Sequence, residues 1–203
     1  MAHNLTSRDE LIPSELIGLS QPITAEQFEQ LCSKYRDLRL ELTSTGELIV
    51  MPPTGSLTGS SNSNLTYQLE AWSQEHESGV CFGSSAGFTL PNGAIRSPDA
   101  SWIKHENWDR LTEQQKRGFA PICPDFAVEI RSPSDQLTQL YLKMFEYLEN
   151  GTLLGWLIDP FKRQVYVYRP NQETVVLDNL ESVAADPLLP GFKLNLTKVW
   201  SVE

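Results

Sequence analysis

The chain has 203 residues, of which 40% are hydrophobic and 21% are charged, with a formal net charge of −10 and a pI near 4.8. This composition excludes extensive disorder, and the length suits one domain with a full hydrophobic core. The acidic balance argues against a general nucleic-acid binder, because Lys and Arg side chains supply most of the affinity for phosphates.

The cysteines and the amino-terminal residues indicate the cellular compartment of the protein. Cys32, Cys81 and Cys123 are odd in number and lack paired metal-binding spacing, which is typical of reduced thiols in the cytoplasm. Asp9 and Glu10 lie where a signal peptide requires an apolar run, and no stretch approaches the ~20 apolar residues of a membrane span. We therefore expect a cytoplasmic protein with no membrane partner.

The beginning of the chain predicts an arm, a helix and a hairpin. Residues 1–22 are polar and contain two prolines, which indicates an irregular arm, and residues 23–203 are expected to form a single domain. Thr24 can cap a helix that runs to about Leu38. Residues 39–51 then alternate about a Ser-Thr-Gly turn, which predicts a hairpin.

A second helix is expected within residues 54–78. Its apolar residues are spaced as one helical face requires, and Asn62 belongs to the same face. That amide needs hydrogen-bond partners, and a satisfied buried amide is a simpler explanation for it than a site residue. The apolar residues of this face are Leu65, Leu69 and Trp72.

Short strands follow, and one of them opens with an acid. The turn at Asn92-Gly93 is a strong hairpin signal. Asp99 begins the regular part of the next strand, and residues 105–119 predict a short helix and a loop. The short strands expected in this part cover residues 80–82, 87–90 and 96–103.

The most informative strand covers residues 126–130, which are apolar except for Glu129. With a side-chain period of two, Phe126, Val128 and Ile130 point one way, and Glu129 points the other way together with Arg131. A buried unpaired carboxylate is costly. Glu129 is therefore either an ion-pair partner or a metal ligand.

The rest of the chain completes an α/β pattern. Asp135 can cap an amphipathic helix that ends at Asn150-Gly151. A strand followed by a helix and a strand favours a mixed central sheet flanked by helices, with additional hairpins. The later strands are expected at residues 153–158, 164–168 and 174–177, with a loop and a short strand or turn in 187–199.

Asp99 and Glu129 would lie on neighbouring strands, with the carbonyl group of Ile130 beside them. Two carboxylates and a carbonyl are hard oxygen ligands of the sort that Mg²⁺ or Mn²⁺ accepts. Such an ion activates a water molecule and stabilises charge on a phosphate. The alternatives are a turn or capping role for Asp99 and an ion pair for Glu129.

These residues match a known pattern. The chain resembles the PD-(D/E)xK nuclease superfamily and, more closely, the Uma-type restriction endonuclease family. The resemblance implies a restriction-endonuclease-like α/β core, Mg²⁺ or Mn²⁺ held by Asp99, Glu129 and the Ile130 carbonyl, and hydrolysis of phosphodiester bonds, most simply in DNA. The matching blocks span about three quarters of the chain and are Met51–Gly55, Arg96–Asp99, Pro124–Asp135, Lys143 with Tyr147, Gly155–Pro160 and Leu189–Phe192.

One position departs from the superfamily pattern. Arg131 stands where the superfamily has its lysine, and an arginine cannot release a proton. Lys143, on the flank of the following helix, can extend toward Glu129 and take this role, or it can be an ordinary solvated side chain. The resemblance thus leaves Lys143 and Arg131 as candidates for the catalytic cation.

Two functions remain open. The first is a metal-dependent endonuclease, which we expect to act as a homodimer because duplex DNA suits paired sites. The second is a non-catalytic binding or assembly module that keeps the nuclease-like fold, with Glu129 paired to Arg131. The acidic surface and the missing lysine favour the second.

Overall fold

The structure is a computed structural model in which residues 16, 21–51 and 54–200 are described. The arm predicted over residues 1–22 lies mostly outside the described residues, as do Pro52 and Pro53 of the first matching block.

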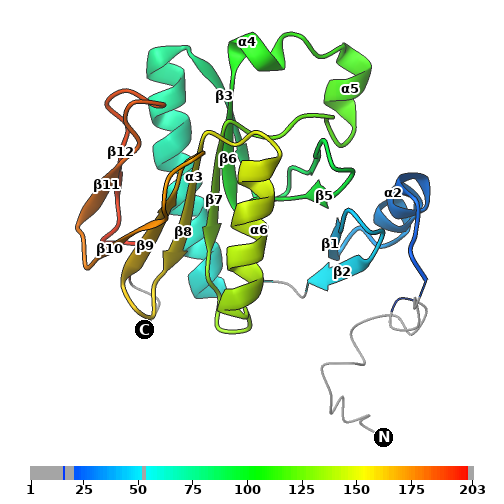
Figure 1. Cartoon of the computed structure of the whole chain (residues 1–203), viewed down its shortest axis with the longest axis horizontal. Helices are drawn as coiled ribbons and strands as arrows, with labels where there is room; N and C mark the ends of the chain where they lie inside the picture. The colour runs from blue at the N-terminus through cyan, green and yellow to red at the C-terminus, as the bar shows by residue number, and fades with distance from the viewer. Residues whose placement is uncertain (1–15, 17–20, 52–53, 201–203) are drawn as a thin grey trace, which may run out of the picture.

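A six-stranded mixed sheet forms the centre of the fold (Figure 1). Neighbours β7 and β8 are parallel, and the other neighbouring pairs are antiparallel. The predicted mixed sheet is therefore confirmed. From one edge to the other, the strands are β10 (Val175–Asp178), β9 (Gln164–Tyr168), β8 (Leu154–Asp159), β7 (Phe126–Ile130), β6 (Ala100–Lys104) and β3 (Gly79–Gly83).

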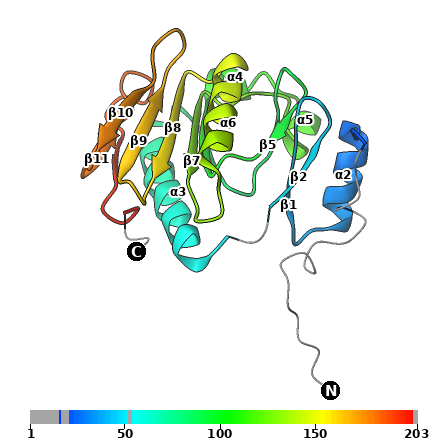
Figure 2. The same ribbon diagram turned by 60° about the horizontal axis from the view of Figure 1, so that its bottom comes forward.

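Helices α3 (Ser56–His76) and α6 (Leu137–Glu149) cover opposite faces of this sheet (Figures 1 and 2). The α3 side is closed by the leucines predicted on its inward face, together with apolar residues of β7. On the α6 side, Met144 and Tyr147 are fully buried against Ala127. The alternation predicted for β7 is confirmed, because its odd and even positions pack against different helices.

A smaller sheet with strand order β2-β1-β5-β4 lies beside the main one, to the right of α6 in Figure 1. Helix α2 (Ala25–Lys34) packs on it through Phe28, and Thr24 and Gln27 form the capping box at its start. The helix ends at Lys34, four residues before the predicted end, because the chain turns there to enter β1. The strands are β2 (Leu48–Met51), β1 (Arg39–Leu42), β5 (Ile95–Arg96) and β4 (Phe88–Thr89).

The strand predicted over residues 96–103 is divided between the two sheets. Ile95–Arg96 belongs to the smaller sheet, whereas β6 of the main sheet begins at Ala100. Pro98 lies between them, and a proline has no N–H group to donate to a ladder. Asp99 consequently precedes β6 in the linking segment.

The cap predicted for α6 is wrong. Gln136 is the N-cap residue, and the carboxylate of Asp135 accepts a hydrogen bond from the backbone N–H of Ser132 at 2.7 Å instead. A short Ser-Pro-Ser-Asp turn thus leads from β7 to α6.

In the part of the chain that the structure describes, no helix combines the length and the apolar character that a membrane span requires. The remaining elements are α4 (His105–Trp108), α5 (Glu113–Arg117), β11 (Ser182–Ala184) and β12 (Lys193–Asn195).

Candidate active site

A pocket of about 510 Å³ lies where the two sheets and the two main helices meet. Asp99, Glu129, Ile130 and Lys143 all line it, although they come from segments far apart in the sequence. The rest of its described lining comes from Arg39 and Met51 of the smaller sheet, residues 54–58 at the start of α3, residues 132–135 of the turn, and Leu140.

Asp99 is fixed by bonds to both of its carboxylate oxygens. Its Oδ2 accepts a hydrogen bond from the backbone N–H of Ile130 at 2.9 Å, and its Oδ1 accepts one from the Asn62 amide at 2.9 Å. Asp99 directly precedes β6, whose first residue, Ala100, pairs with Val128 of β7. The Asp99 and Glu129 carboxylates both line the pocket at this end of the two strands.

Glu129 is buried, with 4% of its surface exposed, and two donors meet its Oε1 atom. The Tyr147 hydroxyl donates at 2.9 Å, and the Lys143 amine lies at 2.8 Å. Burial raises the pKa of Glu129 to about 7; Lys143 opposes this shift, and the neighbouring Asp99 and Glu41 carboxylates add to it. Burial and the two nearby carboxylates thus make the charged form of Glu129 less favourable than in water, although Lys143 partly offsets this.

Lys143 lies between two carboxylates. Its Nζ atom is 2.8 Å from Oε1 of Glu129 and 2.8 Å from Oε1 of Glu41, and 11% of its side chain is exposed. Burial acts to lower the pKa of Lys143, but the Glu129 and Glu41 charges outweigh burial and raise the pKa. The amine stays protonated, so it can supply positive charge but cannot act as a base at neutral pH.

Arg131 points elsewhere. Its guanidinium pairs with Asp159 at 2.9 Å and stacks over the ring of Phe161, with its Cζ atom 5.4 Å from the centroid. For the non-catalytic module we predicted an ion pair between Glu129 and Arg131. This prediction is wrong, because Glu129 pairs with Lys143. Of the two candidate cations, Lys143 lines the pocket, and Arg131 is not among the described residues that line it.

Arg39, Asn62 and Glu41 make contacts that the sequence did not predict. Arg39 Nη1 lies 3.4 Å from Oδ1 of Asp99. The amide predicted on the α3 face finds Asp99 as its partner, so Asn62 is both buried and part of the site. Helical spacing signalled Asn62, whereas Arg39 and Glu41 read as ordinary strand residues.

The oxygen atoms of the pocket determine which kind of metal ion could bind there. The described residues contain no group of three or more His, Cys, Asp or Glu side chains that could hold a metal ion. Mg²⁺ does not require such a group, since one or two carboxylates, water molecules and substrate phosphates commonly complete its shell. Two buried carboxylates, Asp99 and Glu129, beside a backbone carbonyl fit a hard divalent cation.

Comparison with known proteins gives the family. A family model described as "Uma2: Putative restriction endonuclease" matches residues 25–197. The chain belongs to the Uma2 family. The match extends from α2 to the segment after β12, so it includes both sheets and every residue of the pocket. The resemblance to the Uma-type restriction endonuclease family, stated from the sequence motifs, is confirmed.

A solved structure shares the fold of this Uma2 member. It is the 1.96 Å crystal structure of a putative nuclease belonging to DUF820 from Anabaena variabilis, with a TM-score of 0.74 and 26% sequence identity. The similarity covers 89% of this chain and 98% of that one. No curated protein matches the chain. The restriction-endonuclease-like α/β architecture is therefore shown.

Proposed function

We propose that this protein is a Mg²⁺- or Mn²⁺-dependent endonuclease that hydrolyses phosphodiester bonds of DNA. The observation that carries the proposal is the convergence of Asp99, Glu129 and Lys143 on one pocket. The family and the fold are those of nucleases, which supports a hydrolase acting on nucleic acid. The ion and the choice of DNA are our inferences from the hard oxygen donors and from the family description.

In this proposal, Asp99, Glu129 and the carbonyl group of Ile130 hold the ion. Tyr147 and Lys143 both contact Oε1 of Glu129, so the ion would bind through Oε2. Asp99 is kept in place by the Ile130 N–H group, which ties its orientation to the end of β7. A bound Mg²⁺ lowers the pKa of a water molecule and offsets charge on the phosphate.

The protein groups around the pocket would bind and orient the phosphate. Lys143 holds a positive charge beside Glu129, where it can steady negative charge that develops on the phosphate. Arg39 adds a second cation at the pocket wall. Helix α3 starts at Ser56 without a side-chain cap at Gly55, and its first residues line the pocket. Backbone N–H groups at a helix start favour anions.

The proposal is tested by assaying purified protein on DNA and RNA with Mg²⁺, Mn²⁺ or EDTA. We expect metal-dependent internal cleavage of DNA, and on the order of 1000-fold less in Glu129→Gln and Asp99→Asn. Calorimetry should show weaker Mg²⁺ binding by both variants. Asp109→Asn, at the exposed end of α4, is the matched control and should cleave normally. Equal cleavage by wild type and Glu129→Gln would indicate a contaminant and reject the proposal, and cleavage of RNA alone would correct the substrate.

We further propose that the nuclease is a two-fold homodimer. Strand β10 lies at the edge of the main sheet, and Val175 and Val176 are 51% and 42% exposed. An exposed apolar edge strand is a site for pairing with another chain, and antiparallel pairing of identical edges satisfies two-fold symmetry. Light scattering should give twice the chain mass for wild type and one chain mass for Val176→Lys; a monomeric wild type would refute the dimer.

A further inference from the structure

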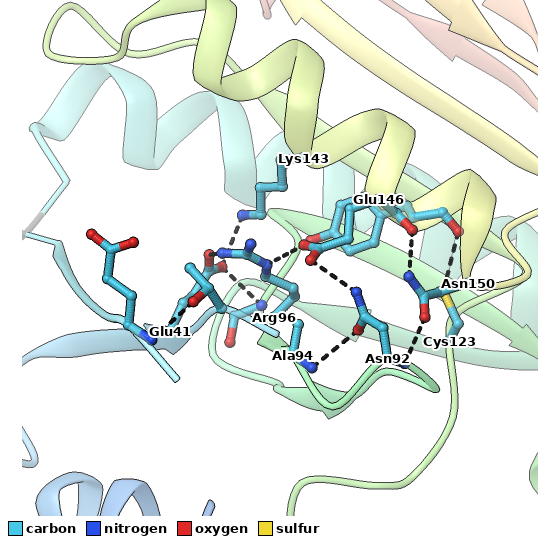
Figure 3. A network of polar contacts seen from close by, with 12 residues as sticks. Glu41, Asn92, Ala94, Arg96, Cys123, Lys143, Glu146 and Asn150 are labelled. Atoms are coloured by element: carbon cyan, nitrogen blue, oxygen red, sulfur yellow. Dashed lines mark hydrogen bonds and ion pairs between the residues drawn. The ribbon is translucent and has the colours of Figure 1, made fainter. Parts of the chain in front are cut away.

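Glu41 belongs to a polar network that joins β1 of the smaller sheet to helix α6 (Figure 3). Only 2% of its surface is exposed. Its Oε1 accepts hydrogen bonds from the Lys143 amine at 2.8 Å and from the backbone N–H of Ser97 at 2.9 Å. Its Oε2 pairs with Arg96 at 3.2 Å. Glu41 therefore contacts three residues from two segments of the chain, the end of β5 and helix α6.

The position of Glu41 is itself fixed. Arg96, which holds Oε2 of Glu41, also donates to Glu146 of α6 at 2.6 Å. Figure 3 shows Arg96 between Glu41 and Glu146, with Asn92 bound to the far side of Glu146. Because two donors besides Lys143 hold the Glu41 carboxylate, it cannot easily follow a change in the charge of the pocket.

The two carboxylates that contact Lys143 differ in their relation to the proposed metal ion. Glu129 is one of the proposed metal ligands, so a divalent cation would share the carboxylate that Lys143 now contacts at 2.8 Å. Like charges repel strongly at such distances in a buried site. The second carboxylate, Glu41, is then the anion that can retain the ammonium group in the pocket, because it lies on the other side of the amine.

Glu41 also acts on Asp99 through the backbone. The Ser97 N–H group that it binds is two residues before Asp99, in the link between β5 and β6. Arg39, two residues before Glu41 in β1, contacts the Ser97 carbonyl at 3.1 Å and Asp99 at 3.4 Å. The same short strand thus holds both the lysine and the segment that carries the first carboxylate.

We propose that Glu41 is a positioning residue that keeps Lys143 in the pocket when a divalent metal ion engages Glu129. This inference rests on the proposed function and adds a residue that does not touch the phosphate or the metal. In the metal-free protein, Glu129 and Glu41 share the lysine. In the metal-bound protein, Glu41 holds it alone, and the Arg96 and Ser97 contacts keep Glu41 from moving with it.

The test combines two measurements on Glu41→Gln, an isosteric change that removes the charge. The first is the cleavage rate at saturating DNA, which we expect to fall on the order of 100-fold. The second is acetylation of Lys143 by acetic anhydride, followed by peptide mass spectrometry, in EDTA and in Mg²⁺. We expect Mg²⁺ to accelerate labelling of Lys143 on the order of tenfold in the variant and to leave wild type slow.

Two further variants control the test. Glu47→Gln makes the same substitution at an exposed position of the same hairpin and should behave as wild type in both measurements. Glu41→Asp retains the charge that Arg96 requires but lengthens the contact with Lys143, so intermediate values are expected. The Asp variant carries the test if the Gln variant does not fold, as judged by near-ultraviolet circular dichroism. Wild-type values in both measurements would then reject the inference.

The outcomes separate the inference from the function on which it rests. If wild type cleaves and Glu41→Gln cleaves equally well, or if its Lys143 labelling ignores Mg²⁺, the positioning role is wrong and the nuclease proposal stands. If wild type neither binds Mg²⁺ nor cleaves nucleic acid, both are wrong. A loss of folding without Mg²⁺-dependent labelling in either Glu41 variant would assign Glu41 a purely structural role.

Discussion

The two faces of strand β7 are equally buried and chemically opposite. Phe126 and Val128 point toward α3 and are fully enclosed in an apolar cluster. Glu129 points toward α6, where a tyrosine and a lysine contact it. Packing explains the first face completely, whereas the second face has a carboxylate whose burial works against its charge. Burial alone therefore does not distinguish a structural side chain from a site residue, whereas the position of Glu129 in the wall of the pocket does.

The largest effect should come from Lys143→Met, which removes the cation from the charged face. We expect the cleavage rate to fall on the order of 1000-fold, because the phosphate then loses the cation that lies beside Glu129. Mg²⁺ affinity by calorimetry should be unchanged or higher, since the lysine no longer competes for Glu129. Lys162→Met, at an exposed position, is the control. Full activity of the Lys143 variant would remove this residue from the mechanism.

A substitution on the apolar face of β7 should lower the stability of the protein and not its cleavage rate. Phe126→Ala deletes a fully buried ring that contacts Trp156, so we expect a loss of about 3–5 kcal/mol in the free energy of unfolding by urea titration. The fraction that remains folded should cleave DNA at nearly the wild-type rate. A variant that is stable but inactive would mean that this face also takes part in the chemistry.

Arg131 provides a smaller test of the same comparison. Arg131→Ala leaves the buried Asp159 without its guanidinium partner, so we expect about 1–3 kcal/mol of lost stability. Because Arg131 and Asp159 are not among the described residues that line the pocket, the cleavage rate should change less than about threefold, well below the effect expected for a group at the reacting phosphate. A loss as large as that of Lys143→Met would show that Arg131 acts on the substrate.

The smallest expected effect is on the stability of the protein at acidic pH. Burial alone would raise the pKa of Glu41, but the Lys143 and Arg96 charges hold this pKa below its ordinary value of 4.5. A carboxyl group with a lowered pKa in the folded state stabilises the protein fully above its unfolded pKa and loses that contribution as the pH falls through its folded pKa. The difference in unfolding free energy between wild type and Glu41→Gln should therefore narrow below pH 4.5. A constant difference from pH 6 to pH 3 would contradict this.

Local sequence patterns predicted the parts of the site that depend on one element. The period of two placed Glu129 opposite the apolar face of β7, and helical spacing placed Asn62 on the inner face of α3. The flank position of Lys143 on α6 is also where the structure has it. The proposed catalytic roles, however, depended on the likeness to a nuclease family, because spacing alone left Glu129 as either a ligand or an ion-pair partner.

The contacts that could not be predicted are those between the two sheets. In β1, Glu41 alternates with Leu40 and Leu42, which predicts a solvent-facing acid in an amphipathic strand. It is buried because α6 and Arg96 lie over that face. The division of the strand at Pro98 was missed for a related reason, since only the tertiary arrangement shows that the residues before and after the proline belong to different sheets.

The distance along the chain between Glu41 and Lys143 has a consequence for synthesis. These residues are 102 positions apart, and contacts of such long range form late because the loop between them must close first. During translation, β1 emerges well before α6, so Glu41 cannot contact Lys143 until α6 has been synthesised. Under the proposed function, the hydrolytic centre is complete only after α6 has been made and packed, and nascent chains are inert toward the nucleic acid around them.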